Sequence, residues 1–241
     1  MEIQEKSLEN LNSVQSLEVA SAVSHQLRNP LLALRLYVKD LAEAKDEGLR
    51  KTLLDNSIEL IDHMSASIGF MLDYSRIFNG ARKLKPAEIP VKEFLNKLLL
   101  GSKPLMDQKQ QKLILTIDEN IHNLWADPDA LYQASENLLT NAIIYTPKGK
   151  QIEVQLKALP ENALFMVVDS GVGISEEDQK HLFEAYFRSN EAREVNPQGN
   201  GLGLAMVNAL VFLWGGRLYF HSAEDEGSVF GFSIPYHNKS L

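Results

Sequence analysis

The 241-residue sequence predicts two domains, an all-α helical hairpin followed by an α+β sandwich. Two observations support this division. Over residues 4–79 the apolar side chains follow a seven-residue rhythm, which is typical of paired helices. Near residues 80–90 glycine and proline become frequent, and the periodicity turns into a mixture of helix and strand patterns. We therefore assign residues 1–80 to the first domain, residues 81–89 to a linker and residues 90–241 to the second domain.

The first domain is predicted to consist of two helices joined by a turn at residues 46–48 (DEG). Apolar or small residues recur at alternating steps of three and four, at Leu17, Ala20, Ser24, Leu27, Leu31, Leu34, Val38 and Leu41, and then at Leu54, Ile58, Ile61, Ser65, Ile68, Leu72 and Ser75. A second stripe widens the apolar face of the second helix, at Leu53, Leu60, Met64 and Met71. One hairpin cannot cover this much apolar surface, so we expect two chains to form a dimeric four-helix bundle. A plain coiled-coil dimeriser would explain the stripes equally well.

The second domain alternates helical and strand patterns. Helices are predicted at residues 91–108, 128–145 and 201–214, and strands at residues 112–118, 150–158, 163–169, 217–222 and 228–234. A polar, glycine-rich region between residues 170 and 200 has little periodicity. Helices and mostly antiparallel strands in separate runs predict a sheet with helices on one face.

Composition limits the classes of function. The net charge of -8 argues against a general nucleic-acid binder. No apolar run is long enough to span a bilayer, and the start of the chain is too charged for a signal peptide, so we expect no membrane contact by this fragment, although a longer parent protein could be anchored. The absence of cysteine excludes disulfides and thiolate metal sites and is typical of a cytoplasmic protein.

Three stretches of the second domain carry candidate chemistry. Asn137 and Asn141 are one helical turn apart, so their amides point the same way, and amide oxygens are hard ligands suited to Mg²⁺. Two asparagines at this spacing are more often solvated or capping residues. Asp169 ends an apolar strand and precedes Gly171 and Gly173; its carboxylate would accept a hydrogen bond from an adenine amino group. A glycine-containing turn explains that stretch equally well.

The third stretch is residues 199–204 (GNGLGL), which open a helix. Free N–H groups and the positive end of the helix suit a phosphate. The glycine spacing differs from the dinucleotide fingerprint and follows a polar loop rather than a strand. The sequence contains no P-loop motif, so that mode of phosphate binding is excluded.

Together these stretches resemble, in order and spacing, the N, G1 and G2 boxes of the ATP-binding domain of sensor histidine kinases. That domain has the Bergerat-type fold, shared with gyrase-type and heat-shock chaperone ATPases. Residues 183–188 (FEAYFR) are similar to the family's F box, and residues 214–217 and 227–235 to its closing strands. In the first domain, residues 24–31 (SHQLRNPL) are similar to the H box.

The resemblance implies ATP and Mg²⁺ as cofactors and assigns roles to named residues. Asn141 would be a Mg²⁺ ligand with Asn137 close by, Asp169 would receive the adenine amino group, and Tyr145 would lie against the base. Arg188 would neutralise the transferred phosphate or be an ordinary exposed arginine. A mobile lid at residues 188–200 would close over the nucleotide. The glycines of the two loops would make room for the base and the phosphates; they are Gly171, Gly173, Gly199, Gly201 and Gly203.

His25 would be the phosphoacceptor, because a neutral imidazole nitrogen is a competent nucleophile. Pro30 would loosen the helix just after it. Gln26 stands where the family most often has Glu or Asp, and an amide cannot act as a base. Asn29 stands where the family positions the water that hydrolyses a phosphoaspartate.

In the N box Ile144 replaces the usual Lys or Arg, which leaves Lys148 as the candidate substitute.

We therefore expect a dimeric sensor histidine kinase core that phosphorylates His25 from ATP, passes the phosphoryl group to an aspartate of a separate response regulator, and also dephosphorylates that regulator. Two alternatives stay open. One is an enzyme biased towards phosphatase activity, and the other is a non-catalytic dimeric scaffold that binds nucleotide only to set its shape.

Overall fold

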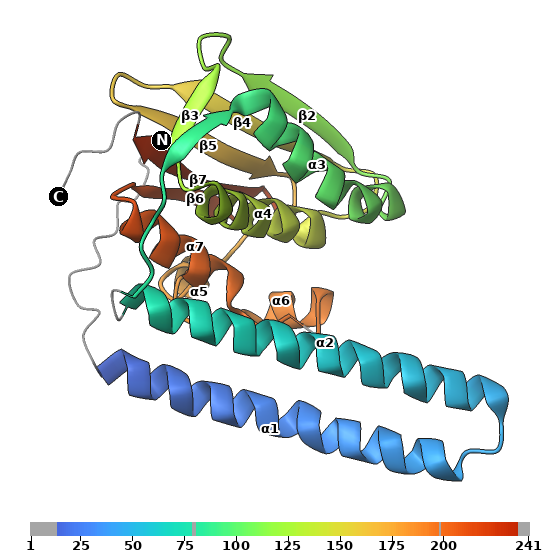
Figure 1. The fold of residues 1–241 in the computed structure, drawn as a ribbon. Helices are drawn as coiled ribbons and strands as arrows, with labels where there is room; N and C mark the ends of the chain where they lie inside the picture. Colours follow the sequence, from blue (N-terminus) through green and yellow to red (C-terminus); the bar gives the residue numbers. More distant parts are fainter. Residues whose placement is uncertain (1–13, 79–80, 198, 236–241) are drawn as a thin grey trace. The chain divides into compact units, whose positions relative to one another are not determined.

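The computed structural model describes residues 14–78, 81–197 and 199–235, which fall into two compact units (Figure 1). The first unit is a hairpin of two long helices, α1 (Val14–Glu43) and α2 (Glu47–Phe78). Helix α2 begins where the Asp46 carboxylate accepts a hydrogen bond from the N–H of Leu49, at 2.7 Å. Helix α1 continues through Pro30 rather than ending there. Because proline has no N–H, the carbonyl of Gln26 lacks its usual helical partner.

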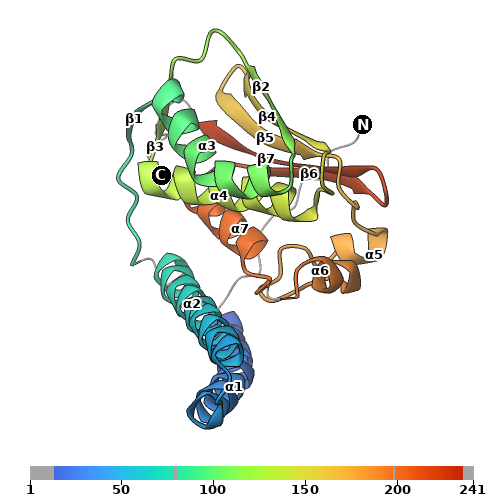
Figure 2. The same cartoon turned by 90° about the vertical axis from the view of Figure 1, so that its right-hand side faces the viewer.

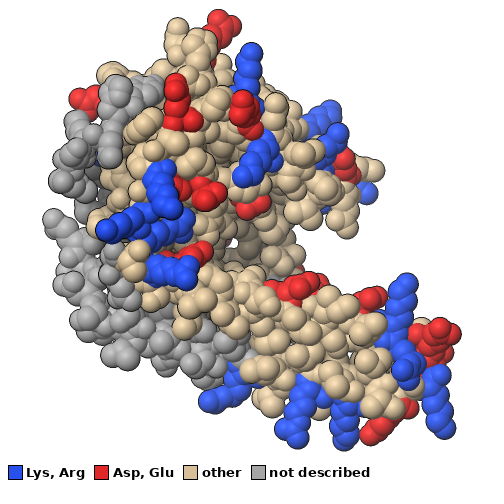
Figure 3. Space-filling view, in the orientation of Figure 1, with Lys and Arg blue, Asp and Glu red and all other residues tan. Residues whose placement is uncertain are grey.

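The two apolar stripes of α2 have different surroundings. The second stripe is the more buried, with Leu53 only 8% exposed, whereas five residues of the first stripe are between 46% and 50% exposed: Leu54, Ile58, Ile61, Ile68 and Leu72. In Figure 3 the middle of the hairpin presents a broad area without charged side chains, while charged side chains line its edges and cluster at the turn. Packing between α1 and α2 therefore uses one apolar stripe and leaves the other in solvent.

The second unit is built on a five-stranded sheet in the order β2-β4-β5-β7-β6. The strands are β2 (Lys112–Ile117), β4 (Gln151–Ala158), β5 (Asn162–Asp169), β6 (Leu218–Ala223) and β7 (Gly227–Pro235). Strands β2 and β4 are parallel, and the other neighbours are antiparallel. A separate two-stranded sheet pairs β1 (Ala87–Pro90) with β3 (Asn123–Ala126).

Three helices cover one face of the five-stranded sheet: α3 (Val91–Gln108), α4 (Pro128–Tyr145) and α7 (Gly203–Leu213) (Figures 1 and 2). Alternate residues of β4 and β5 are buried, which is the pattern of a sheet with one covered face. At the centre of the core, Phe165 stacks on Phe232 with ring centroids 5.2 Å apart, and Phe94 meets Phe165 edge-on. The predicted α+β sandwich is confirmed.

Two short helices lie within the polar region between β5 and α7. They are α5 (Glu176–Gln179) and α6 (Asn190–Val195), and each begins at a serine whose hydroxyl accepts a backbone N–H. The sequence prediction missed both helices and the strands β1 and β3, because segments of four to six residues carry no measurable periodicity. Among the described residues, no helix is both long and apolar enough to cross a membrane.

Candidate functional site

A cavity of about 270 Å³ lies among α4, α7, the end of β5 and the loop that carries α6. Nine of the ten residues predicted to bind nucleotide line it: Asn137, Asn141, Tyr145, Asp169, Gly173, Arg188, Gly199, Gly201 and Gly203. The tenth, Gly171, lies just behind it, where its N–H donates to Asp169 Oδ1 at 2.8 Å. Residues far apart in the sequence are therefore assembled at one place, while their individual roles stay predictions.

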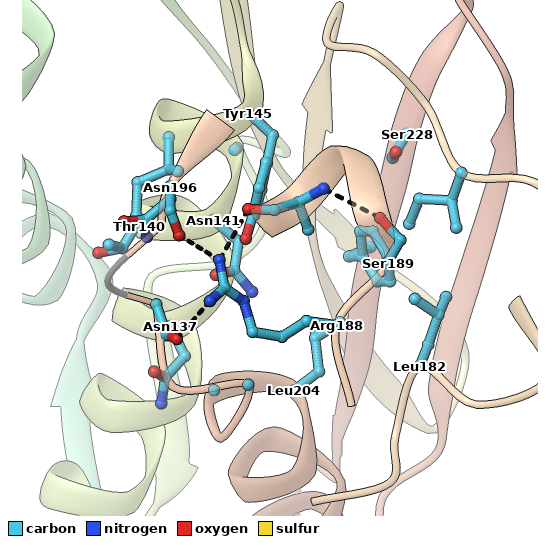
Figure 4. Close-up of a pocket in the computed structure, with 18 of the residues that line it drawn as sticks. Asn137, Thr140, Asn141, Tyr145, Leu182, Arg188, Ser189, Asn196, Leu204 and Ser228 are labelled. Carbon is cyan, nitrogen blue, oxygen red and sulfur yellow. Dashed lines mark hydrogen bonds between the residues drawn. The ribbon is translucent and has the colours of Figure 1, made fainter. Parts of the chain in front are cut away.

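Helix α4 brings Asn137 and Asn141 to the cavity (Figure 4). The helix is anchored at its start, where the Asp127 carboxylate accepts the N–H groups of residues 129 and 130 and Pro128 occupies the first helical position. The amide nitrogen of Asn137 donates to the carbonyl of Gln133 at 3.0 Å. Its Oδ1 is thus left as an acceptor on the cavity side, which is the kind of neutral oxygen that Mg²⁺ accepts as a ligand.

The start of α7 faces these two amides. A side chain at Gly203 would place its Cβ 3.2 Å from Asn137 Oδ1 and 3.7 Å from Asn141 Nδ2. Helix α7 has no side-chain cap, so its first N–H groups have no helical acceptor and point out of the helix end. Uncapped N–H groups beside two amides form a suitable cradle for the phosphates of a nucleotide.

Asp169 lines the cavity from the end of β5. Burial raises the pKa of its carboxyl group to about 6, although hydrogen bonds from the backbone N–H groups of Gly171 and Ser228 act in the opposite direction. At neutral pH the group is a partly desolvated carboxylate, which accepts hydrogen bonds strongly. Gly173 follows with φ +68°, and a Cβ there would come within 1.8 Å of the Ala223 carbonyl oxygen, so this turn requires glycine.

Arg188 lies within the cavity, and its surroundings differ from those of an exposed arginine. Its guanidinium donates to the carbonyls of Ala192 at 2.7 Å, Gly199 at 2.7 Å and Pro197 at 3.2 Å, and also to that of Asn196 (Figure 4). All four carbonyls belong to the loop at residues 188–200, which contains α6. Burial raises the pKa of Tyr145, and the nearby Arg188 charge partly offsets this. Arg188 therefore links several carbonyls of this loop to one another beside the cavity that it lines.

The structure also adds lining residues that the sequence motifs did not single out. Thr140 stands three residues after Asn137 on the same helix face, so helical spacing alone would have pointed to it. Ser228 is paired with Asp169 across β5 and β7, and such a cross-strand neighbour has no local sequence signal. Lys148, the suggested substitute for a basic residue in the N box, is not among the lining residues.

The predicted phosphoacceptor lies in the helical unit. His25, Gln26 and Asn29 all fall within α1, and Asn29 is exposed. The side chains of His25 and Gln26 are outside the described part of the structure. The helical spacing puts Asn29 one turn beyond His25.

Comparison with known proteins agrees with this two-part arrangement. Residues 15–80 match the family model of the "His Kinase A (phospho-acceptor) domain", and residues 126–238 match that of the "Histidine kinase-, DNA gyrase B-, and HSP90-like ATPase". The chain belongs to the sensor histidine kinases. It combines the phosphoacceptor domain and the ATP-binding domain of that family, and the predicted fold class of both parts is confirmed.

The sensor protein kinase WalK of Staphylococcus aureus is 28% identical over 222 residues, which are 90% of this chain and 53% of that relative. In other strains the match covers 36% of WalK, so the chain spans about half or less of these relatives. The solved structure of the histidine kinase AdeS of Acinetobacter baumannii has the same fold, with a TM-score of 0.72, 24% identity and coverage of 89% of this chain and 98% of AdeS.

Two further solved structures share the fold. The histidine kinase ThkA, in complex with the response regulator protein TrrA, has a TM-score of 0.73 and 19% identity, and covers 93% of this chain and 63% of ThkA. Full-length ShkA, in complex with AMPPNP, has a TM-score of 0.68 and 22% identity, and covers 94% of this chain and 47% of ShkA.

Proposed function

We propose that this chain transfers the terminal phosphoryl group of ATP to His25 and then to an aspartate of a separate response regulator. The observation that carries the proposal is the single cavity that unites a partly buried carboxylate, two helix amides and an uncapped helix start. These three features match three parts of Mg²⁺-ATP: a base with an amino group, a cation and a phosphate chain. The complex of ShkA with AMPPNP shows an ATP analogue bound by a protein of this fold.

Within the cavity we assign Asp169 to the adenine amino group, the start of α7 to the phosphates, and Asn141 with Asn137 to Mg²⁺. When bound, Mg²⁺-ATP supplies the phosphoryl group and neutralises much of the phosphate charge. Arg188 can contribute further positive charge once its guanidinium leaves the loop carbonyls that now hold it. We infer that the loop at residues 188–200 is the lid, and that its opening and the release of Arg188 are one event.

At the phosphoacceptor, the unprotonated imidazole nitrogen of His25 attacks the terminal phosphorus, a P–N bond forms, the bond to the bridging oxygen breaks, and ADP leaves. Attack requires an unprotonated imidazole nitrogen. The phosphoryl group then passes to a carboxylate of the response regulator. Since ThkA forms a complex with the response regulator TrrA, we propose a receiver protein of that kind as the partner. Since the proposed reaction consumes ATP, we propose that this part of the protein lies in the cytoplasm.

The exposed stripe of α2 supports a homodimer. Five aliphatic side chains each about half exposed on one helix form an apolar surface that a monomer would leave in water. Pairing two hairpins along this stripe buries it in a four-helix bundle. We propose this arrangement for the intact chain.

The dimer predicts a mass by light scattering of twice 27.1 kDa at micromolar concentration. The double variant Ile58→Glu/Ile61→Glu should scatter as a monomer, because it places two charges in the stripe that the dimer would bury. Ala66→Glu adds a charge at an exposed position of the same helix and should stay dimeric. A wild-type chain with the mass of one protomer would contradict the proposed bundle.

We expect Gln26 and Asn29, which follow His25 on α1, to set the balance between kinase activity and phosphatase activity. Gln26→Glu restores a general base beside the histidine and should speed autophosphorylation by about 10²-fold. Asn29→Ala removes the exposed amide that would orient water and should lose phosphatase activity towards a phosphorylated receiver while keeping autophosphorylation. Both rates are measured by following labelled phosphate on the kinase and on the receiver. A Gln26→Glu variant no faster than the wild type would show that the imidazole proton leaves without help from position 26.

The proposed kinase is tested by incubating the chain with ATP labelled at the terminal phosphate. Label should enter the protein in the presence of Mg²⁺ and should not do so after chelation with EDTA, because the phosphate charge is then uncompensated. The non-catalytic alternative predicts a different result. A scaffold would bind Mg²⁺-ATP and acquire no label under either condition, which would overturn the kinase proposal.

A further inference from the structure

The end of α4 is held by two side chains from the segment that follows α3. The last carbonyls of a helix have no partner within it. Lys109 Nζ donates to the carbonyls of Ile143 at 2.8 Å and Ile144 at 2.6 Å. Gln111 Nε2 donates to the carbonyl of Ile143 at 3.0 Å and to that of Thr146 at 2.7 Å. We call Lys109 and Gln111 the α4 clamp.

Backbone hydrogen bonds at the end of α3 hold the two clamp residues in place. Lys109 caps the C-terminus of α3, and the N–H of Gln111 donates to the carbonyl of Met106 at 3.0 Å. In return, the N–H of Gly149, beyond the end of α4, donates to the Lys109 carbonyl at 2.9 Å. The Lys109 side chain is partly buried, and this burial lowers the pKa of its ammonium group. Hydrogen bonds in both directions therefore join the ends of α3 and α4.

The clamped turn leads directly into the cavity. Asn141 and Tyr145 belong to the last turns of α4 and line the cavity. The Tyr145 carbonyl oxygen lies against Gly171, where a Cβ would be only 2.7 Å from it and 2.7 Å from Asp169 Oδ1. Any shift of the end of α4 therefore changes the spacing between Tyr145 and the turn that carries Asp169.

We propose that Lys109 and Gln111 are positioning residues for nucleotide binding, which hold the end of α4 so that Asn141, Tyr145 and the Asp169 turn keep their spacing. This inference rests on the proposed function of the cavity. The positive charge of Lys109 at the C-terminus of the helix adds a favourable interaction with the helix dipole. Neither residue lines the cavity, so both act through the backbone of α4.

The test uses the full chain and Mg²⁺-ADP as the probe, with affinity measured by titration calorimetry well below the unfolding temperature of every variant. Lys109→Met and Gln111→Met should each weaken binding by about 10-fold, since each removes two hydrogen bonds to carbonyls at the end of α4. Lys109→Arg keeps the charge and the donors and should restore most of the affinity. Lys112→Met removes an exposed lysine three residues away and is the matched control, with wild-type affinity.

Two additional measurements separate positioning from simple loss of stability. Both clamp residues donate to the Ile143 carbonyl, so each single variant keeps one donor there, and the double variant should lose more affinity than the product of the single losses. Hydrogen exchange of the last-turn amides of α4, measured without nucleotide, should be faster in the clamp variants. Faster exchange with unchanged Mg²⁺-ADP affinity would overturn the positioning role, and unchanged exchange would overturn the clamp itself. A wild-type chain that binds no Mg²⁺-ADP would instead overturn the proposed function together with this inference.

Discussion

Asp169→Asn is expected to weaken ATP binding by at least about 100-fold, because one amide oxygen cannot replace two carboxylate oxygens here. The carboxylate already accepts hydrogen bonds from the backbone N–H groups of Gly171 and Ser228, and an adenine amino group would be a further donor. An asparagine has one acceptor oxygen, and its NH₂ group would face at least one of these donors. Either the base or the backbone would therefore be left without an acceptor.

Titration calorimetry with Mg²⁺-ATP measures this loss, and Asp107→Asn, which removes the same charge from an exposed position, is the control with unchanged affinity. The pKa of about 6 adds a pH signature: the adenine acceptor should be lost as the pH falls through 6 and the carboxyl group becomes neutral. Because this pKa lies above the ordinary value of 3.8, the ionised group lowers the free energy of unfolding progressively as the pH rises from about 4 to 6. Wild-type affinity in Asp169→Asn would show that the base binds elsewhere.

His25→Gln is expected to abolish acid-labile phosphorylation, with less than about 1% of the wild-type label, while Mg²⁺-ATP affinity stays unchanged. The glutamine amide is not a nucleophile towards phosphorus, whereas an imidazole nitrogen is. The helical unit that carries residue 25 supplies none of the lining residues of the cavity, so the substitution should leave binding intact.

His221→Gln is the matched control for this variant, because it removes an exposed histidine on β6 and should label like the wild type. Acid-labile label that persists in His25→Gln would place the phosphoacceptor on another residue.

Much of the architecture was predictable from local signals. The helices at residues 91–108 and 128–145 have the predicted bounds, since strong periodicity coincides with clear start signals such as the Asp127-Pro128 pair before α4. The nucleotide residues were found because their order and spacing follow a family pattern. The sequence could not show which stripe of α2 packs inside the hairpin, because both stripes are apolar and only the structure shows that Leu53 is covered while Leu54 is not.

The contacts that position the residues of the cavity could not be predicted from local sequence patterns. The α4 clamp joins residues more than thirty positions apart, and a lysine and a glutamine after a helix have many ordinary uses. The pairing of Ser228 with Asp169 depends on strand register. The hydrogen bonds from Arg188 to the loop carbonyls depend on how a region without periodicity folds. These polar contacts depend on the tertiary fold and leave no pattern along the chain.

The most direct test of the account is to locate the phosphoryl group after the wild-type chain has reacted with Mg²⁺-ATP. The account predicts label that is lost in acid and kept in alkali, and mass spectrometry that places it on the peptide containing His25. Acid-stable phosphate on a serine, threonine or tyrosine, or nucleotide binding with no phosphorylated residue, would contradict it.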